Sequence, residues 1–146
     1  MQKSKLTVLI VEDEPNDVSL LKRAFKKIGV EASRIFTVQD GEDAINYLLA
    51  KDPFDDREKF PYPDVVLTDL KMPRKNGFEL LMWLRDNPIY QVIPTIVFSS
   101  SRDERDVRQA YYLGANSYMV KPHTTQELES LMTLAIDYWK RCELPT

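Results

Sequence analysis

Short apolar runs alternate five times with segments of helical character, and this alternation limits the folds that the chain can adopt. The runs fall at residues 6–11, 34–38, 65–68, 95–98 and 117–120. Strands joined through helices pair in parallel, because the crossover returns the chain to the edge from which it started. The pattern therefore predicts an α/β domain in which helices cover both faces of a five-stranded parallel sheet.

Helix signals fall between the predicted strands. Pro15 suits the first position of a helix, and Gly29 suits the position just after its end. A second helix is expected over residues 42–49, and Asn76-Gly77 is expected to start a third. The helices therefore alternate with the strands along the chain.

Two segments have the S/T-x-x-E pattern of a capping box, in which the first and last residues exchange hydrogen bonds at a helix start. Residues 101–104 and residues 124–127 match it, so we expect the fourth and fifth helices to begin there. Gly114 is expected to end the fourth helix.

Residues 50–63 interrupt the alternation of strands and helices. Three prolines and several charged residues fall in this stretch, which has no apolar periodicity. Such a composition is typical of an exposed loop. Whether the loop has a function is left open by the sequence.

Length and composition argue against several functional classes. The chain has 146 residues, enough for one domain with a core but too few for two. Its formal net charge of −3 does not favour binding to nucleic acid. No apolar run approaches the ~18 residues of a membrane span. The single cysteine, Cys142, fits a reducing cytoplasm, and one cysteine with one histidine argues against a zinc site.

Charged residues directly follow three of the predicted strands. Glu12 and Asp13 follow the first run, Asp69 follows the third, and Lys121 follows the fifth. In an open parallel sheet, ligands bind beyond the carboxyl ends of the strands. We therefore expect three carboxylates and one ammonium group to share a crevice at this edge.

A carboxylate cluster of this kind needs a counter-charge, because carboxylates at short range repel one another. An all-oxygen site suits Mg²⁺, which keeps several waters and takes only one or two carboxylates directly. We expect Asp13 and Asp69 to bind the ion and Glu12 to hold a metal-bound water. The backbone carbonyl of Lys71, which follows Asp69 closely, is expected to reach the ion as well.

The balance of charge in this cluster favours phosphoryl transfer. Mg²⁺ and Lys121 offset the carboxylates, so the site can receive a phosphoryl group whose charge spreads over its oxygens. A carboxylate can act as the nucleophile and then forms an aspartyl phosphate. The Ser99 hydroxyl, at the end of the fourth strand, can donate a hydrogen bond to a phosphoryl oxygen. A cis bond before Pro122 would fix the direction of the lysine stem.

Four motifs in this order resemble the receiver domain of two-component response regulators. They are Val-Glu-Asp-Glu at 11–14, Leu-Thr-Asp-Leu-Lys-Met-Pro at 67–73, Asn-Gly at 76–77 and Met-Val-Lys-Pro at 119–122. Each motif alone is weak, but the combination is specific and extends over nearly the whole chain. The resemblance implies the flavodoxin-like receiver fold, with strand order 2-1-3-4-5.

The resemblance also implies a role for each residue of the cluster. The phosphoacceptor would be Asp69, the acidic pair Glu12 and Asp13, the switch hydroxyl Ser99, the phosphate-binding lysine Lys121 and the switch aromatic Tyr118. A sensor histidine kinase would donate the phosphoryl group in phosphorelay signal transduction.

Three further features are similar to the stand-alone regulators that partner bacterial phytochromes. They are the loop at 50–63, the Ile-Pro-Thr-Ile-Val-Phe-Ser-Ser-Ser stretch, and the Tyr-Trp and Leu-Pro pairs near the end. A phytochrome-type kinase is therefore an expected partner. One departure is Ser99-Ser100-Ser101, where the family usually has Thr-Thr-Ser or Thr-Ser.

Other interpretations stay open at this point. Each carboxylate taken alone could be a helix cap or an ordinary loop residue. A Mg²⁺-dependent phosphohydrolase with an aspartate nucleophile would have a similar site, but it needs a second acid two residues later to protonate the leaving group. Position 71 is Lys, so we expect a signalling module and not an enzyme. A pseudo-receiver that only binds partners is a third possibility.

Aromatic residues and Met near the end of the chain predict a surface for self-association, since these residue types are enriched in interface cores. The set comprises Tyr111, Tyr112, Tyr118, Met119, Leu134, Tyr138 and Trp139. We expect a symmetric homodimer through the fourth helix, the fifth strand and the fifth helix. The alternative is that these side chains only cover the core of a monomer.

No output domain is expected after the last helix. Residues 1–146 are therefore predicted to be a single receiver domain that signals through protein contact or onward phosphotransfer.

Overall fold

Five parallel strands form one sheet in the computed structural model, which describes residues 5–145. The strands are β1 (Val8–Val11), β2 (Ile35–Val38), β3 (Val65–Thr68), β4 (Thr95–Ser99) and β5 (Ser117–Val120). Their order in the sheet is β2-β1-β3-β4-β5, so the predicted topology is confirmed. The order of the strands reverses between β1 and β3, and open α/β sheets bind their ligands beyond the carboxyl ends of the strands at such a point.

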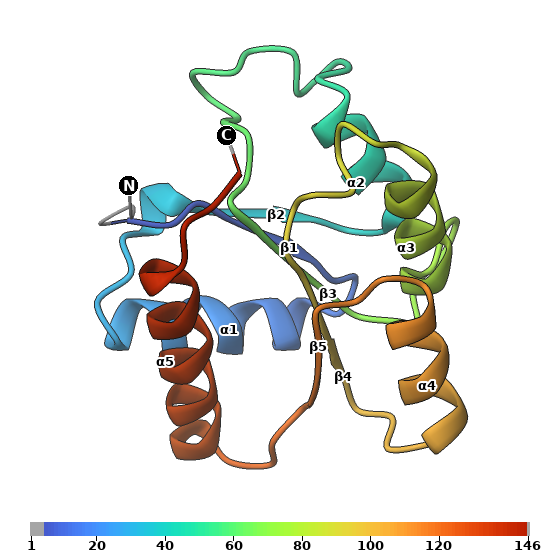
Figure 1. Ribbon diagram of the computed structural model, residues 1–146. Helices are drawn as coiled ribbons and strands as arrows, with labels where there is room; N and C mark the ends of the chain where they lie inside the picture. The colour runs from blue at the N-terminus through green and yellow to red at the C-terminus, as the bar shows by residue number, and fades with distance from the viewer. Residues whose placement is uncertain (1–4, 146) are drawn as a thin grey trace.

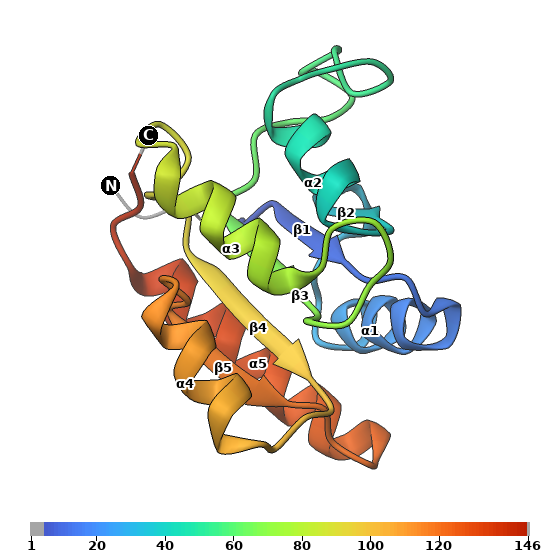
Figure 2. The same cartoon turned by 90° about the vertical axis from the view of Figure 1, so that its right-hand side faces the viewer.

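Helices cover both faces of the sheet (Figures 1 and 2). They are α1 (Pro15–Lys27), α2 (Gly41–Leu48), α3 (Gly77–Asp86), α4 (Glu104–Tyr112) and α5 (Thr125–Arg141), and the short 3₁₀ helix η1 (Ala32–Arg34) precedes β2. Helices α1 and α5 pack on one face, and α2, α3 and α4 pack on the other. None of the helices within residues 5–145 is long and apolar enough to span a bilayer.

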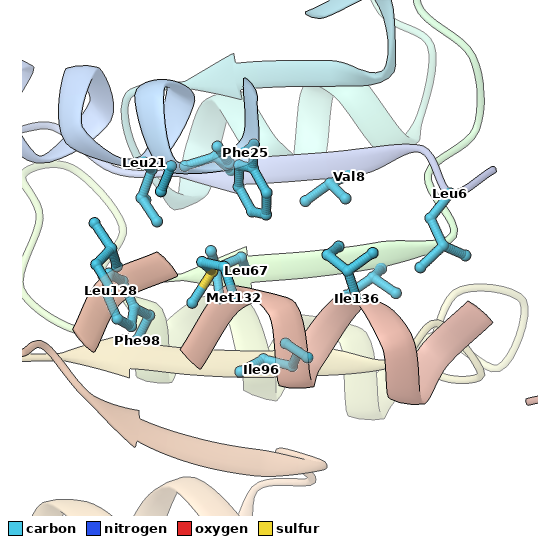
Figure 3. Close-up of a cluster of buried hydrophobic side chains, with 14 residues drawn as sticks. Leu6, Val8, Leu21, Phe25, Leu67, Ile96, Phe98, Leu128, Met132 and Ile136 are labelled. Carbon is cyan, nitrogen blue, oxygen red and sulfur yellow. The ribbon is translucent and has the colours of Figure 1, made fainter. Parts of the chain in front are cut away.

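The core consists of apolar side chains on both sides of the sheet. Successive strand residues point to opposite faces, so Val8 and Ile10 contact α1 and α5, whereas Leu9 and Val11 contact α2 and α3. Figure 3 shows the first of these clusters, in which Met132 and its neighbours on α5 face the strands. Burial on both faces explains why the strands read as continuous apolar runs.

The starts of the last two helices differ in how well the sequence predicts them. Thr124 caps α5 and accepts the backbone N–H of Glu127 at 3.1 Å, which confirms the helix start and one of the two hydrogen bonds of the predicted capping box. The predicted capping box of α4 is wrong. Asp103 is the N-cap and accepts the N–H of Arg105 at 2.9 Å. Because Asp103 occupies the capping position, the Ser101 hydroxyl donates to Asp106 at 2.6 Å instead.

The segment 50–63 is a loop, as predicted, but its aromatic side chains anchor it to α2 and β2. Phe54 and Phe60 are partly buried, and their rings lie 5.2 and 6.0 Å from the ring of Tyr47. The Arg57 guanidinium donates to two backbone carbonyls at 2.7 and 3.0 Å. The predicted exposed loop is therefore confirmed over most of its residues. The sequence does not predict its aromatic anchors, since single side chains leave no periodic pattern.

Candidate functional site

The carboxyl ends of four strands meet at one edge of the sheet and bring the predicted charged residues together. The register places the ends of β1 and β3 level with each other. Backbone hydrogen bonds continue beyond the strands: the N–H of Asp69 donates to the Val11 carbonyl at 3.0 Å, and the N–H of Lys121 donates to the Ser99 carbonyl at 2.8 Å. The backbone is thus fixed where the side chains of the site emerge.

Lys121 lies at the centre of this site. Its Nζ donates to Oε1 of Glu12 at 2.6 Å, to Oδ2 of Asp17 at 2.7 Å and to Oδ2 of Asp69 at 3.0 Å. Three carboxylates therefore surround one ammonium group. The ammonium alone leaves an excess of negative charge, which favours an additional cation.

Asp17 is a site residue that the pattern of charged strand ends does not predict. It lies in the first turn of α1, on the helix that follows the acidic pair. Its signal in the sequence is an acidic residue in the first turn of the helix that follows the acidic pair, where a carboxylate also interacts favourably with the helix dipole.

Burial changes the proton affinity of two groups in the site. Glu12 is only 4% exposed, and loss of water raises its pKa to about 7 against the opposing hydrogen bond from Lys121. Burial by itself lowers the pKa of Lys121, but the hydrogen bonds to Asp17, Glu12 and Asp69 outweigh burial and raise it above its usual range. Lys121 is therefore a permanent positive charge at neutral pH.

The carboxylate oxygens form a set of donors for a metal ion. One oxygen each from Glu12, Asp13 and Asp69 lies within 4.8 Å of the others. Hard oxygen donors at a partly exposed edge fit a divalent cation that keeps several waters. Lys71 lies in the loop after Asp69 with an exposed side chain, and the role of its carbonyl stays a prediction.

The two predicted switch residues are connected through the loop that follows β4. Ser99 is 2% exposed, and its Oγ accepts the N–H of Ser101 at 3.1 Å. Tyr118 is half-buried on β5, and its hydroxyl donates to the Ser101 carbonyl at 2.9 Å. A movement of Ser99 therefore acts on a loop that Tyr118 also holds.

The expectation of a cis bond before Pro122 is wrong. Within residues 5–145 the cis bond precedes Pro53. The hydrogen bonds of Lys121 to its three carboxylates orient the lysine stem instead.

Comparison with known protein families tests the resemblance that the four motifs indicate. The family model of the response regulator receiver domain matches residues 8–133, a range that contains every residue of the site. The chain belongs to the response regulator receiver family. This receiver is thus a component of two-component signalling, and the phosphohydrolase alternative is not favoured. Receiver domains are signalling modules that bind a divalent metal ion, which the acidic cluster fits.

Three relatives of this receiver are similar over nearly their whole length. The response regulator Rcp1 of Synechocystis sp. is 30% identical over 90% of this chain and 87% of its own length. A solved Mn²⁺-bound form of Rcp1 is 27% identical and has a TM-score of 0.78, with 97% of this chain and 99% of that chain covered. The response regulator RPA3017 in red light signalling of R. palustris is 32% identical, with a TM-score of 0.90 over 97% and 99% of the chains. The phosphorylated cyanobacterial phytochrome response regulator RcpA is 27% identical, with a TM-score of 0.86 over 98% and 100%.

Proposed function

We propose that this receiver accepts a phosphoryl group on Asp69 from the phosphohistidine of a sensor histidine kinase. The ion pair between Lys121 and Asp69 carries the proposal, since it joins a carboxylate nucleophile to a cation at the edge where ligands bind. Asp69 is also partly exposed, so a donor can approach it.

In the proposed reaction a carboxylate oxygen of Asp69 attacks the phosphorus atom of the donor. The bond from phosphorus to the histidine nitrogen breaks, and its electron pair stays on the imidazole, which takes up a proton. The N–H of Leu70 donates to Oδ1 of Asp69 at 2.7 Å and orients the carboxylate. Lys121 stabilises the charge on the transferred oxygens. The product is an aspartyl phosphate on Asp69.

Mg²⁺ is the cation that we infer for this site. Asp13, Asp69 and the Lys71 carbonyl would bind it directly, and Glu12 would hold one of its waters. When bound, the ion neutralises negative charge on the phosphoryl oxygens. The hard, all-oxygen donor set supports this choice.

The phosphoryl group is proposed to act through Ser99 and Tyr118. The Ser99 hydroxyl would turn from the N–H of Ser101 toward a phosphoryl oxygen, and Tyr118 would follow the rearranged loop. This local change biases a two-state element, which a partner protein then reads. The output surface would be α4, β5 and α5.

The kinase that we infer as donor is of the phytochrome type, and the compartment is the cytoplasm, where ATP supplies such kinases. The likeness to RcpA and to RPA3017 supports this partner. We infer signalling without substrate turnover, because Lys71 stands where an aspartate-based phosphohydrolase needs an acid.

A second copy of the chain is the partner that we propose for the α4–β5–α5 surface. Tyr111, Leu134 and Tyr138 are exposed there, at 49%, 68% and 62%. The ring of Tyr112 lies 5.2 Å from the Arg85 guanidinium and therefore faces α3. A groove of about 600 Å³ beside them is lined by Met119, Leu134, Tyr138 and Trp139 among others. A stable dimer needs a total buried area of about 1,200 Å², which three adjoining elements can supply.

Two assays on the purified chain test the proposed chemistry. Acetyl phosphate with Mg²⁺ should add one phosphoryl group to the intact protein, and the label should disappear when EDTA is present. Steady-state release of phosphate from a phosphate monoester should stay at the level of a protein-free control. Sustained turnover of the monoester without a labelled protein would replace the receiver function with that of a phosphohydrolase.

A further inference from the structure

The loop between β3 and α3 (residues 70–76) is fixed where it leaves the phosphoacceptor. The N–H of Gly77 donates to the Leu70 carbonyl at 2.9 Å and closes the base of the loop. Gly77 also approaches Asp69 so closely that a Cβ would lie 2.2 Å from the Asp69 carbonyl oxygen. The first residue of the loop therefore has little freedom relative to the site.

The tip of the same loop is held by the start of α2. The Arg74 guanidinium donates from Nε to Oδ2 of Asp40 at 2.7 Å and from Nη2 to Oδ1 at 3.1 Å, which is a bidentate pair. The same Nη2 donates to Asp43 at 2.7 Å. In the backbone, the N–H of Gly41 donates to the Lys75 carbonyl at 2.8 Å. The α2 segment thus contacts two consecutive loop residues.

Two features of this contact show that it is specific. Asp40 is a buried carboxylate, only 5% exposed in its side chain, and it also caps α2 through the N–H of Asp43. A buried carboxylate needs a charged partner, and Arg74 supplies one. Arg74 has a φ of 61°, a left-handed conformation that is unfavourable for a residue with a side chain. The ion pair therefore maintains a backbone conformation that the residue itself does not prefer.

We propose that Arg74 is a positioning residue for the metal site, because it ties the β3–α3 loop to α2 and so fixes the Lys71 carbonyl beside Asp69. Only Lys71, Met72 and Pro73 lie between the fixed base of the loop and its fixed tip. The carbonyl of Lys71 is consequently confined between two anchored points. The inference rests on the proposed function only in assigning that carbonyl to the cation.

Binding of Mg²⁺ to the full chain, followed by NMR, tests this role without requiring activity. Arg74→Ala and Asp40→Asn should each weaken the affinity about tenfold, as for residues that orient metal ligands indirectly. Asn keeps the helix cap at position 40, so Asp40→Asn isolates the ion pair. The double variant should bind no more weakly than Arg74→Ala, because that variant has already lost the contact with Asp40. Arg74→Lys should recover part of the affinity.

Two variants separate the ion pair from other effects. Arg74→Gly removes the guanidinium but adopts the left-handed backbone freely, so it should also lose affinity. Arg105→Ala removes an exposed arginine of the Asp103 ion pair and should bind Mg²⁺ as the wild type does. Hydrogen exchange at Lys71 and Met72 should be faster in Arg74→Gly. Wild-type affinity and exchange in Arg74→Gly would overturn the positioning role.

The failure of this inference can be distinguished from failure of the proposed function. If acetyl phosphate labels the wild type but the Arg74 and Asp40 variants bind Mg²⁺ as tightly as the wild type, the positioning role alone is wrong. If the wild type is never labelled but those variants lose affinity for Mg²⁺, the phosphoacceptor function is wrong and the role of Arg74 in the metal site is supported.

Discussion

The Nζ of Lys121 lies 3.0 Å from Oδ2 of Asp69, within an ion-pair cluster that also includes Glu12 and Asp17. The lysine therefore compensates the negative charge of Asp69, the proposed phosphoacceptor and metal ligand, and of Glu12, which is proposed to hold a metal-bound water. An incoming cation or phosphoryl group therefore changes the partners of ion pairs that the folded protein already contains.

Lys121→Ala should make the protein less stable without metal and should make Mg²⁺ more stabilising. Removing the ammonium leaves Glu12 and Asp69 uncompensated, and we expect a loss of about 2 kcal/mol, less than for a fully buried pair because Asp17 is partly exposed. Urea unfolding in EDTA and in Mg²⁺ measures both effects. Lys5→Ala, which breaks the exposed pair with Glu31, is the matched control. Equal stability of Lys121→Ala and wild type in EDTA would contradict this account.

Gly77→Ala should damage the site as well as the fold. Its Cβ would meet the Asp69 carbonyl at 2.2 Å, so the backbone must shift, at a cost of about 1–3 kcal/mol. Phosphorylation by acetyl phosphate should slow in the folded fraction. Gly114→Ala is the control. Its φ of 107° should make alanine reduce the stability of the fold by about 1 kcal/mol, but no other atom lies within 4 Å of the added Cβ. If both variants are labelled at the wild-type rate, the tight approach does not matter to the site.

Ser99→Ala should uncouple Tyr118 from the phosphoryl group while leaving Asp69 able to react. The variant lacks the hydroxyl proposed to move toward the phosphoryl oxygen, and it also loses one hydrogen bond worth about 1 kcal/mol. NMR of labelled tyrosine rings, with and without beryllofluoride, measures the response. The Tyr118 signal should move in wild type and in Ser100→Ala, but much less in Ser99→Ala. A full response in Ser99→Ala would remove the serine from the switch.

Tyr138→Glu should abolish the proposed dimer, because a charge at an exposed aromatic of α5 cannot be buried without a partner. Light scattering at up to about 100 μM protein, where even a micromolar interface is populated, measures the mass. Met82→Glu alters an exposed apolar residue on α3, outside the proposed surface, and should leave the dimer intact. A wild type that is monomeric at every concentration, with and without beryllofluoride, would end the dimer proposal.

The sheet and the charged edge were predictable from the sequence because each depends on a short local pattern. A parallel strand buried on both faces is an apolar run, so Val8–Val11 and Val65–Thr68 are visible directly. The residues after these strands must then meet, because parallel strands end at one edge. The sequence pattern therefore predicts that Glu12, Asp69 and Lys121 lie together, and the hydrogen bonds of Lys121 to both carboxylates confirm it.

Contacts between segments that lack a pattern were not predictable in this way. The pair between Arg74 and Asp40 joins two loops 34 residues apart, and neither residue is unusual in its own segment. Phe54 and Phe60 anchor their loop as single side chains, whereas periodicity reveals only regular elements. The cap of α4 was mispredicted because Ser101 and Asp103 both suit the position, and only the path of the chain selects Asp103.

Intact-mass labelling shows directly whether Asp69 is the residue that accepts the phosphoryl group. Wild type, Asp69→Asn and Asp13→Asn would be incubated with acetyl phosphate and Mg²⁺, and their intact masses compared. We predict one phosphoryl group on the wild type, none on Asp69→Asn, and little on Asp13→Asn, which loses a metal ligand but keeps the nucleophile. An Asp69→Asn protein that is labelled as fully as the wild type would contradict the assignment of Asp69 as phosphoacceptor.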